Sequence, residues 1–137
     1  MEIKQITTSD YPRIYAFWST NEIPHIFGSS YEEFASFLET SKQLSYILID
    51  NNEVIGDVIA TYDGISITIY HILIDKNHRL LGYGSKLLQH VFTDAKEFKY
   101  HEICVRTYAS NTGFAKFMKA NNVSIREDLC VYQKLGK

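Results

Sequence analysis

The spacing of apolar residues changes at residue 44, where the helical period of two predicted helices gives way to the strand period of three predicted strands. Residues 2–7 alternate between polar and apolar side chains, which predicts a short first strand. Ser9 or Asp10 can then cap a helix that has Pro12 near its start. The apolar face of this helix consists of Tyr11, Ile14, Tyr15 and Trp18. Ser-Tyr-Glu-Glu at residues 30–33 matches a capping box, so a second helix follows.

Three strands joined by tight turns are predicted over residues 44–50, 54–62 and 65–74. Asn51-Asn52 supplies the first turn. Asp63-Gly64 supplies the second, because Asp-Gly between two apolar runs is a strong signal for a type I′ hairpin. Three consecutive strands with such short connections must pair antiparallel.

Helices and strands alternate in the rest of the chain. A helix after Gly82 carries an apolar stripe at a period of 3.6 residues. The stripe consists of Leu87, Leu88, Val91, Phe92 and Ala95. A strand over residues 102–108 precedes Asn111, which can cap a further helix, and strand-like residues 123–135 close the chain. The predicted order is strand, two helices, three antiparallel strands, helix, strand, helix and one or two terminal strands.

Composition and charge exclude several classes of protein. The 137 residues, 45% of them apolar, suffice for one core, so we expect a single domain over residues 1–137. With a net charge of −2 and scattered basic residues, the chain has no positively charged surface that would attract nucleic acid. Cys104 and Cys130 lie in apolar runs typical of strands, where we expect buried thiols and no disulfide. No signal peptide or membrane span is indicated, and we expect a cytoplasmic protein.

The junction from Ile74 to the helix after Gly82 carries the candidate chemistry. The first N–H groups of a helix lack internal partners and attract anions, and glycines at positions 82 and 84 let the main chain approach a ligand closely. A dinucleotide fingerprint would need a third glycine where Leu87 stands, and the G-x-x-x-x-G-K-[ST] phosphate loop is absent from the sequence. The junction therefore predicts a phosphate or pyrophosphate site of another kind. The five histidines show no metal-ligand spacing, so no metal is expected.

The segment Arg79-Leu80-Leu81-Gly82-Tyr83-Gly84 resembles the Arg/Gln-x-x-Gly-x-Gly/Ala signature of the GNAT superfamily of acetyl-CoA-dependent N-acetyltransferases. The predicted element order is similar to the GNAT fold over essentially the whole chain, which implies an α+β, three-layer fold whose mixed, mostly antiparallel central sheet has helices on both faces. The resemblance implies that loop amides hold the pyrophosphate of CoA. It also implies that the preceding strand splays from its neighbour and binds the pantetheine arm through its backbone. The cofactor-binding residues expected on this basis are Ile72, Leu73, Ile74, Arg79, Leu80, Leu81, Gly82, Tyr83, Gly84, Ser85 and Asn111.

The chain departs from the family pattern at two catalytic positions. Asn111 stands where the second family signature begins, but Met118 occupies the place of the tyrosine that is proposed to protonate the CoA thiolate. Arg106 occupies the place of the glutamate base of one branch, which acetylates the N-terminus of a ribosomal protein. His71 and Tyr108 are the candidate substitutes as base and acid, although each is also a common packing residue in a strand. Neither departure excludes acetyl transfer, because oriented attack can proceed without a dedicated acid.

Strand alternation decides which residues accompany His71. It predicts His71, Leu73 and Asp75 on one face of the sheet. The other face is expected to carry Tyr70, Ile72 and Ile74. The acceptor side is expected between the first two helices and at the hairpins, with Trp18, Glu22, His25, Phe27 and Tyr31 as its candidate residues.

Three functional hypotheses follow. The first is an N-acetyltransferase that moves the acetyl group of acetyl-CoA to a primary amine, of a small molecule or a peptide, by direct attack in a ternary complex. The second is a non-catalytic acyl-CoA-binding module or sensor, and the third is an interaction domain in which the two glycines form only a turn. The expected partners are acetyl-CoA and an amine acceptor, with neither nucleic acid nor membrane, and the protein is a monomer or a homodimer because edge strands of this fold can pair.

Overall fold

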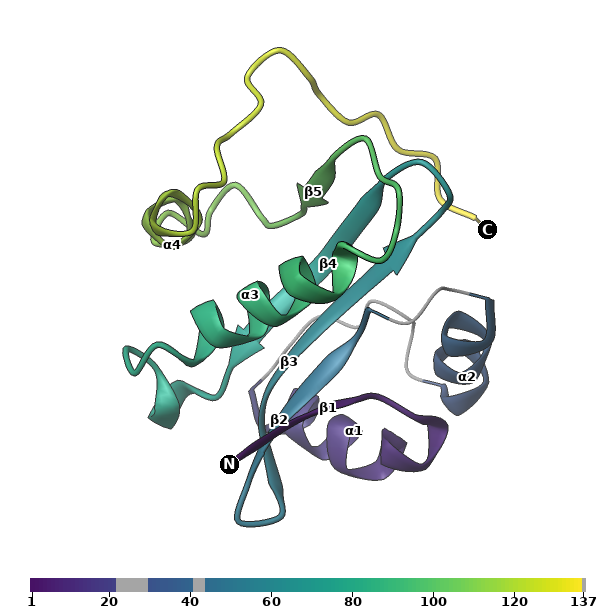
Figure 1. Cartoon of the computed structure of the whole chain (residues 1–137). Helices are drawn as coiled ribbons and strands as arrows, with labels where there is room; N and C mark the ends of the chain where they lie inside the picture. Colours follow the sequence, from purple (N-terminus) through teal and green to yellow (C-terminus); the bar gives the residue numbers. More distant parts are fainter. Residues whose placement is uncertain (22–29, 41–43, 137) are drawn as a thin grey trace. The chain divides into compact units, whose positions relative to one another are not determined.

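The computed structural model describes residues 1–21, 30–40 and 44–136, and the chain divides into two units, Met1–Thr107 and Tyr108–Lys137. The first unit contains a sheet of five strands in chain order (Figure 1). The strands are β1 (Glu2–Gln5), β2 (Tyr46–Asp50), β3 (Glu53–Tyr62), β4 (Ile67–Ile74) and β5 (Ile103–Val105). The helices of this unit are α1 (Tyr11–Thr20), α2 (Tyr31–Thr40) and α3 (Tyr83–Ala95), with the 3₁₀ turns η1 (Thr8–Asp10) and η2 (Lys76–His78). The second unit contains α4 (Phe114–Ala120).

The sheet is mixed and mostly antiparallel, as predicted. β1 to β4 pair antiparallel with their neighbours, and β5 runs parallel to β4. α3 is the crossover that joins this parallel pair. The predicted fold class and the order of the elements through α4 are confirmed. In the described part of the chain, no helix has the length and apolar character needed to cross a membrane.

Helices cover both faces of the sheet in the first unit. On one face, Trp18 of α1 and Phe34 of α2 share a core with Ile59 of β3. On the other face, α3 passes across β3 and β4 (Figure 1). A Cβ added to Gly56 of β3 would lie 2.7 Å from Ile74 Cδ1 and 3.3 Å from a methyl of Leu87, so glycine permits the close approach of α3.

The two predicted hairpins are present, but the second turn is longer than predicted. Asn51 and Asn52 both have positive φ, at 51° and 64°, which is the type I′ geometry of a two-residue turn. In the second hairpin Tyr62 pairs with Ile67, so four residues form the loop. The Asp63 carboxylate accepts hydrogen bonds from two loop amides at 2.9 and 2.8 Å, and this side-chain cap stabilises the four-residue loop.

Three expectations for the last third of the chain are wrong. Residues 123–136 form no strand, and Tyr132 is 93% exposed, because alternating apolar residues become a strand only where another strand offers its edge. Cys104 and Cys130 are exposed rather than buried. The helix cap is Gly113 and not Asn111, whose backbone carbonyl instead accepts from the Phe114 amide at 3.2 Å. A single domain over residues 1–137 stays a prediction.

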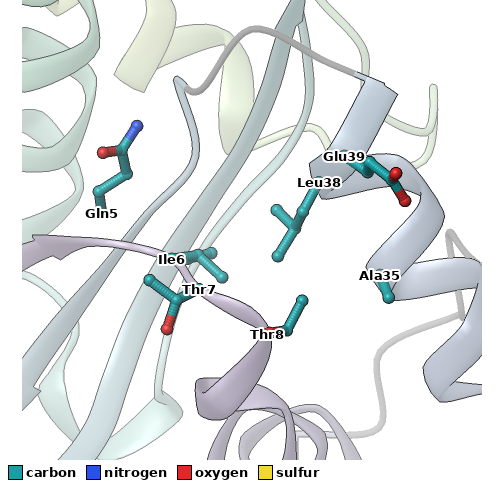
Figure 2. A pocket seen from close by; sticks show the side chains of 7 residues that line it. All are labelled: Gln5, Ile6, Thr7, Thr8, Ala35, Leu38 and Glu39. Carbon is teal, nitrogen blue, oxygen red and sulfur yellow. The ribbon is translucent and has the colours of Figure 1, made fainter.

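An open pocket of about 460 Å³ lies between the end of β1 and α2 (Figure 2). Its lining residues are Gln5, Ile6, Thr7, Thr8, Ala35, Leu38 and Glu39. None of them belongs to β4 or to the loop before α3. The pocket is therefore separate from the residues that the sequence marks as functional.

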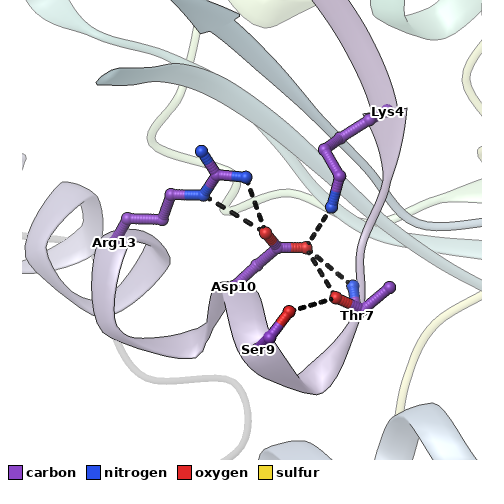
Figure 3. Close-up of polar contacts among 5 residues, drawn as sticks. All are labelled: Lys4, Thr7, Ser9, Asp10 and Arg13. Atoms are coloured by element: carbon purple, nitrogen blue, oxygen red, sulfur yellow. Dashed lines mark hydrogen bonds and ion pairs between the residues drawn. The ribbon is translucent and has the colours of Figure 1, made fainter. Parts of the chain in front are cut away.

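Asp10 organises the start of α1 (Figure 3). Its buried carboxylate accepts hydrogen bonds from Lys4 Nζ at 2.5 Å, from the Thr7 amide at 2.8 Å and from the Arg13 guanidinium at 2.7 Å. Burial by itself raises the pKa of Asp10, but the bonds from Lys4, Thr7 and Arg13 outweigh it and lower the pKa to about 2. Asp10 occupies the predicted cap position of α1, but its side chain makes no capping hydrogen bond to the helix; through Lys4 and Arg13 it joins β1 to α1 instead.

We expect the Asp10 cluster to contribute about 1–2 kcal/mol to the free energy of unfolding at neutral pH. Because the folded pKa lies below the unfolded value of about 3.9, this contribution is complete above pH 4 and is lost as the pH falls towards 2. Asp10→Asn should lower stability at pH 7 and flatten the decline below pH 4, as measured by urea unfolding. Asp128→Asn is the control, because Asp128 pairs with Arg126 on the surface and its loss should change little. Parallel acid profiles for wild type and Asp10→Asn would contradict the assignment.

Candidate active site

The C-terminal half of β4 has an open edge. β4 pairs with β5 only over Ile67–Ile69, and the last contact on this side is the Arg106 amide donating to the Ile69 carbonyl at 3.0 Å. Among the described residues, no strand pairs with Ile72–Ile74 on the side away from β3. Such an edge offers backbone groups to an extended ligand, which would add to the sheet as a strand does. The open edge agrees with the splay that the resemblance implies next to Ile72, Leu73 and Ile74, and the binding of pantetheine there stays a prediction.

The loop after β4 has the backbone geometry of an anion site. Gly82 caps α3 with a φ of +83°, and a Cβ added there would meet nothing within 4 Å. The intrahelical hydrogen bonds of α3 begin with the Lys86 amide donating to the Gly82 carbonyl at 3.1 Å. In helix geometry, the amides of Tyr83 and Gly84 therefore precede the first internal donor and are oriented outward along the axis. Leu80 is fully exposed with a φ of +64°, a strained conformation of the kind found at ligand-binding loops.

Asp75 holds this loop in place. Its carboxylate accepts hydrogen bonds from His78 Nδ1 at 3.0 Å, from the Asn77 amide at 3.1 Å and from Asn21 Nδ2 at 3.2 Å. The hydrogen bond from His78 is the main cause that lowers the pKa of the Asp75 carboxyl, with the bonds from Asn77 and Asn21 adding to it. Arg79 Nε donates to the Ile74 carbonyl at 3.0 Å, which places the guanidinium stem beside the end of β4. The loop is thus ordered by its own side chains and is linked to the end of α1 through Asn21.

A β-bulge at Tyr70 changes the predicted faces of β4. Ile59 pairs with His71 while Ala60 pairs with Ile69, so Tyr70 is an extra residue in β4. Tyr70 consequently packs against the core shared by α1 and α2, as Leu73 does. The prediction that His71 and Leu73 share a face is confirmed, whereas the placement of Tyr70 on the opposite face is wrong, because alternation fails at a bulge.

His71 pairs with a buried carboxylate that the sequence analysis did not single out. His71 Nε2 lies 2.7 Å from Asp57 Oδ2, and Trp18 Nε1 donates to the same oxygen at 2.8 Å. The Asp57 side chain is fully buried and the His71 side chain is 15% exposed. Asp57 and His71 are diagonal neighbours on one face, since Asp57 pairs with Leu73 and His71 with Ile59. The available signal was a charged residue in the middle of the apolar run over residues 54–62.

A match to a protein-family model assigns the chain to a family. The model of the Acetyltransferase (GNAT) family matches residues 3–121. This chain belongs to the GNAT family. It is accordingly an acetyl-CoA-dependent N-acetyltransferase, as the glycine loop and the element order led us to expect. No curated protein matches the sequence.

Solved structures of other N-acetyltransferases share the fold. The ribosomal-protein-alanine N-acetyltransferase from Brucella melitensis biovar Abortus 2308 superposes with a TM-score of 0.76 at 13% identity, over 98% of this chain and 97% of that one. The aminoglycoside 6′-N-acetyltransferase AAC(6')-IG from Acinetobacter haemolyticus gives a TM-score of 0.76 at 14% identity, over 100% of both chains. AAC(6')-Iy in complex with a CoA-containing bisubstrate analogue gives 0.79 at 16% identity, over 98% of this chain and 97% of that one. At these identities the likeness shows the GNAT fold alone.

The remaining GNAT positions are distributed over both units. Arg106, at the position of the branch-specific glutamate, is exposed, and its guanidinium carbon lies 5.4 Å from the centre of the Tyr70 ring. Tyr108 opens the second unit with a 67% exposed side chain, and its carbonyl accepts from the Asn111 amide at 2.9 Å. Met118 is buried within α4. Roles for Tyr108 and Asn111 stay predictions. Of the candidate acceptor-side residues, Glu22, His25 and Phe27 lie outside the described residues.

Proposed function

We propose that this GNAT protein transfers the acetyl group of acetyl-CoA to a primary amine by direct attack in a ternary complex. The observation that carries the proposal is the continuity of the open β4 edge at Ile72–Ile74 with the loop that ends in the left-handed Gly82. The edge supplies backbone hydrogen bonds for the pantetheine arm, and the amides before α3 supply an anion site for the pyrophosphate. Arg79 adds a positive charge at the loop. The cofactor-binding residues are Ile72, Leu73, Ile74, Arg79, Leu80, Leu81, Gly82, Tyr83, Gly84, Ser85 and Asn111.

The chemistry needs a proton acceptor and a means of releasing the thiolate. The amine nitrogen bonds to the thioester carbonyl carbon, the C–S bond breaks and CoA leaves as its thiolate. An ammonium acceptor loses two protons on the way to the amide. A base takes one, and the other ends on the sulfur of the CoA thiolate. His71 is the base in this proposal, because its imidazole lies on the strand that binds the thioester arm. Tyr108 is the proton donor to sulfur, since the thioether of Met118 has no proton to give.

The acceptor class is a primary amine of a small molecule or of a peptide. Proteins with this fold include, by their names, one that acetylates a ribosomal-protein alanine and others that acetylate aminoglycosides. Both kinds of acceptor carry a cationic amine at neutral pH, and both fit the need for a base. A cytoplasmic location and a monomeric or dimeric state stay predictions.

Acetyl-CoA binding and thiol release, measured on one preparation, test the proposal. We expect calorimetry to give a dissociation constant in the micromolar range, and thiol release to rise with at least one amine in a panel. The panel contains an aminoglycoside, a peptide with N-terminal alanine, a lysine peptide and a polyamine. Absence of acetyl-CoA binding would overturn the assignment of the β4 edge and the loop. Binding without thiol release across the panel would instead favour the non-catalytic acyl-CoA-binding module, for which Met118 and Arg106 are the supporting residues.

A further inference from the structure

The hydrogen bonds of Asp57 determine which ring nitrogen of His71 carries the proton. Asp57 Oδ2 accepts from Trp18 Nε1 at 2.8 Å and lies 2.7 Å from His71 Nε2. A carboxylate has only acceptor atoms, so the short contact to Nε2 requires a proton on that nitrogen. In the neutral imidazole, Nδ1 is then the unprotonated nitrogen with a free lone pair.

The surroundings of this pair are unusual for a purely structural contact. Asp57 is 0% exposed, and a buried carboxylate is costly unless its oxygens are paired. Among the described residues, Asp57 Oδ1 and His71 Nδ1 are nonetheless buried without a hydrogen-bond partner. These are two acceptor atoms, and such orphaned atoms indicate a donor that the described part of the chain does not supply. An amine or ammonium group, or a water that links it to Nδ1, is a donor of the required kind.

We propose that Asp57 is a positioning residue that fixes His71 in the Nε2–H tautomer, so that Nδ1 receives the proton of the acceptor amine. This inference rests on the proposed function and specifies how its base works. The proton passes from the ammonium to Nδ1, directly or through one water, and the imidazolium that forms is balanced by the Asp57 carboxylate. The neutral amine then attacks the thioester. Trp18 holds the carboxylate from the side of α1, and its ring stands edge-on to the His71 ring at 6.0 Å between centroids.

Among the residues that the structure describes, Asp57 is the charged partner of His71. On β3 the residue at hydrogen-bond distance is Asp57, and α1 contributes the neutral indole of Trp18. On the β5 side, Arg106 lies over the ring of Tyr70, the residue next to His71 in β4. Within residues 1–21, 30–40 and 44–136, His71 is therefore held by the Asp57 carboxylate and the Trp18 ring, an arrangement that fixes both the tautomer and the ring plane.

Asp57→Asn is the decisive variant. Because Trp18 Nε1 and His71 Nε2 both bond Asp57 Oδ2 and the indole can only donate, the amide oxygen of asparagine takes that place and keeps both bonds. The substitution then removes the negative charge that balances the imidazolium, which weakens His71 as a base. We expect kcat at neutral pH to fall roughly tenfold to a hundredfold, with the KM for acetyl-CoA within about twofold of wild type. The deficit should shrink as the pH rises above the pKa of the acceptor amine itself, because a neutral amine needs no base. A merely structural loss would lower the rate equally at every pH.

A matched control and a spectroscopic measurement separate the possible causes. Asp94→Asn makes the same change beside another histidine, His90, whose Nε2 lies 3.5 Å from Asp94, and the asparagine oxygen can still accept from the Tyr46 hydroxyl. We expect wild-type kinetics from this control. Nitrogen-15 NMR of the imidazoles, with His71 assigned by its loss in His71→Gln, reports the tautomer without any need for turnover. We expect Nδ1 to be unprotonated in wild type.

The outcomes distinguish a failure of the role given to Asp57 from a failure of the proposed acetyl transfer. Wild-type His71 with its proton on Nδ1, an unchanged kcat in Asp57→Asn, or a loss that is the same at all pH values would overturn the role of Asp57 while acetyl transfer stands. A wild-type protein that binds no acetyl-CoA and releases no thiol would overturn the proposed function and this inference with it. If Asp57→Asn does not fold, the wild-type tautomer still decides the question.

Discussion

Gly82→Glu is expected to raise the dissociation constant of acetyl-CoA by at least about 100-fold, which corresponds to roughly 2.7 kcal/mol of binding free energy. Gly82 is the cap of α3 and has a φ of +83°, which a residue with a Cβ adopts only under strain. A side chain at this position extends into open space in front of the helix, where the pyrophosphate is proposed to bind. The glutamate side chain would occupy the space of the pyrophosphate, and its negative charge would repel the phosphates. Isothermal calorimetry with acetyl-CoA measures the effect.

Gly64→Glu is the matched control for this experiment. Gly64 has a φ of +96° and also has open space around the position of an added Cβ, but it lies in the hairpin loop between β3 and β4. The control therefore introduces the same strain and the same charge away from the proposed site. We expect a comparable loss of stability and an unchanged affinity for acetyl-CoA. Gly82→Ala separates the two causes further, because it keeps the strain without the charge. Wild-type affinity in a folded Gly82→Glu protein would show that the loop does not bind the pyrophosphate.

The sequence predicts most of the fold because each element has a local signal. The helical spacing in α1 and the capping box before α2 arise from short-range packing and hydrogen bonding, and the Ser30 hydroxyl indeed accepts from the Glu33 amide at 3.2 Å. The loop before α3 is predicted for the same reason, since the glycine at 82 is needed where φ is positive. Non-local pairing has no such signal. Residues 123–135 therefore read as a strand although they form none, because their pattern does not reveal whether a neighbouring edge exists.

The candidate site was predicted only in part, for a related physical reason. The bulge at Tyr70 depends on the register between β3 and β4, which alternation along β4 alone cannot reveal. It shifts Tyr70 onto the face of the core shared by α1 and α2, next to His71. Asp57 was overlooked because its role depends on contacts with Trp18 and His71, 39 and 14 residues away. The signal available in the sequence was a charged residue inside an apolar strand, since such a residue must find partners when it is buried.

His71→Gln is expected to lower kcat at neutral pH by about 100- to 1000-fold, which is the usual contribution of a general base. Glutamine keeps a polar side chain that can still donate to Asp57, so the buried carboxylate is not left unpaired and the fold should survive. The KM for acetyl-CoA should change little, because the backbone edge and the loop bind the cosubstrate. The rate of thiol release against pH is the measurement, with saturating acetyl-CoA and the best acceptor amine.

The dependence of the rate on pH tests whether His71 is the base. Without a base, the enzyme acts only on the fraction of acceptor that is already neutral, so the rate of His71→Gln should rise about tenfold per pH unit until the pH reaches the pKa of the amine. Wild type, in which His71 takes the proton, should reach its plateau at lower pH. His90→Gln, a surface histidine beside Asp94, should reproduce the wild-type profile. If the profile of His71→Gln overlays that of wild type, another group or the solvent takes the proton, and the pair of Asp57 and His71 is then a packing feature of the core.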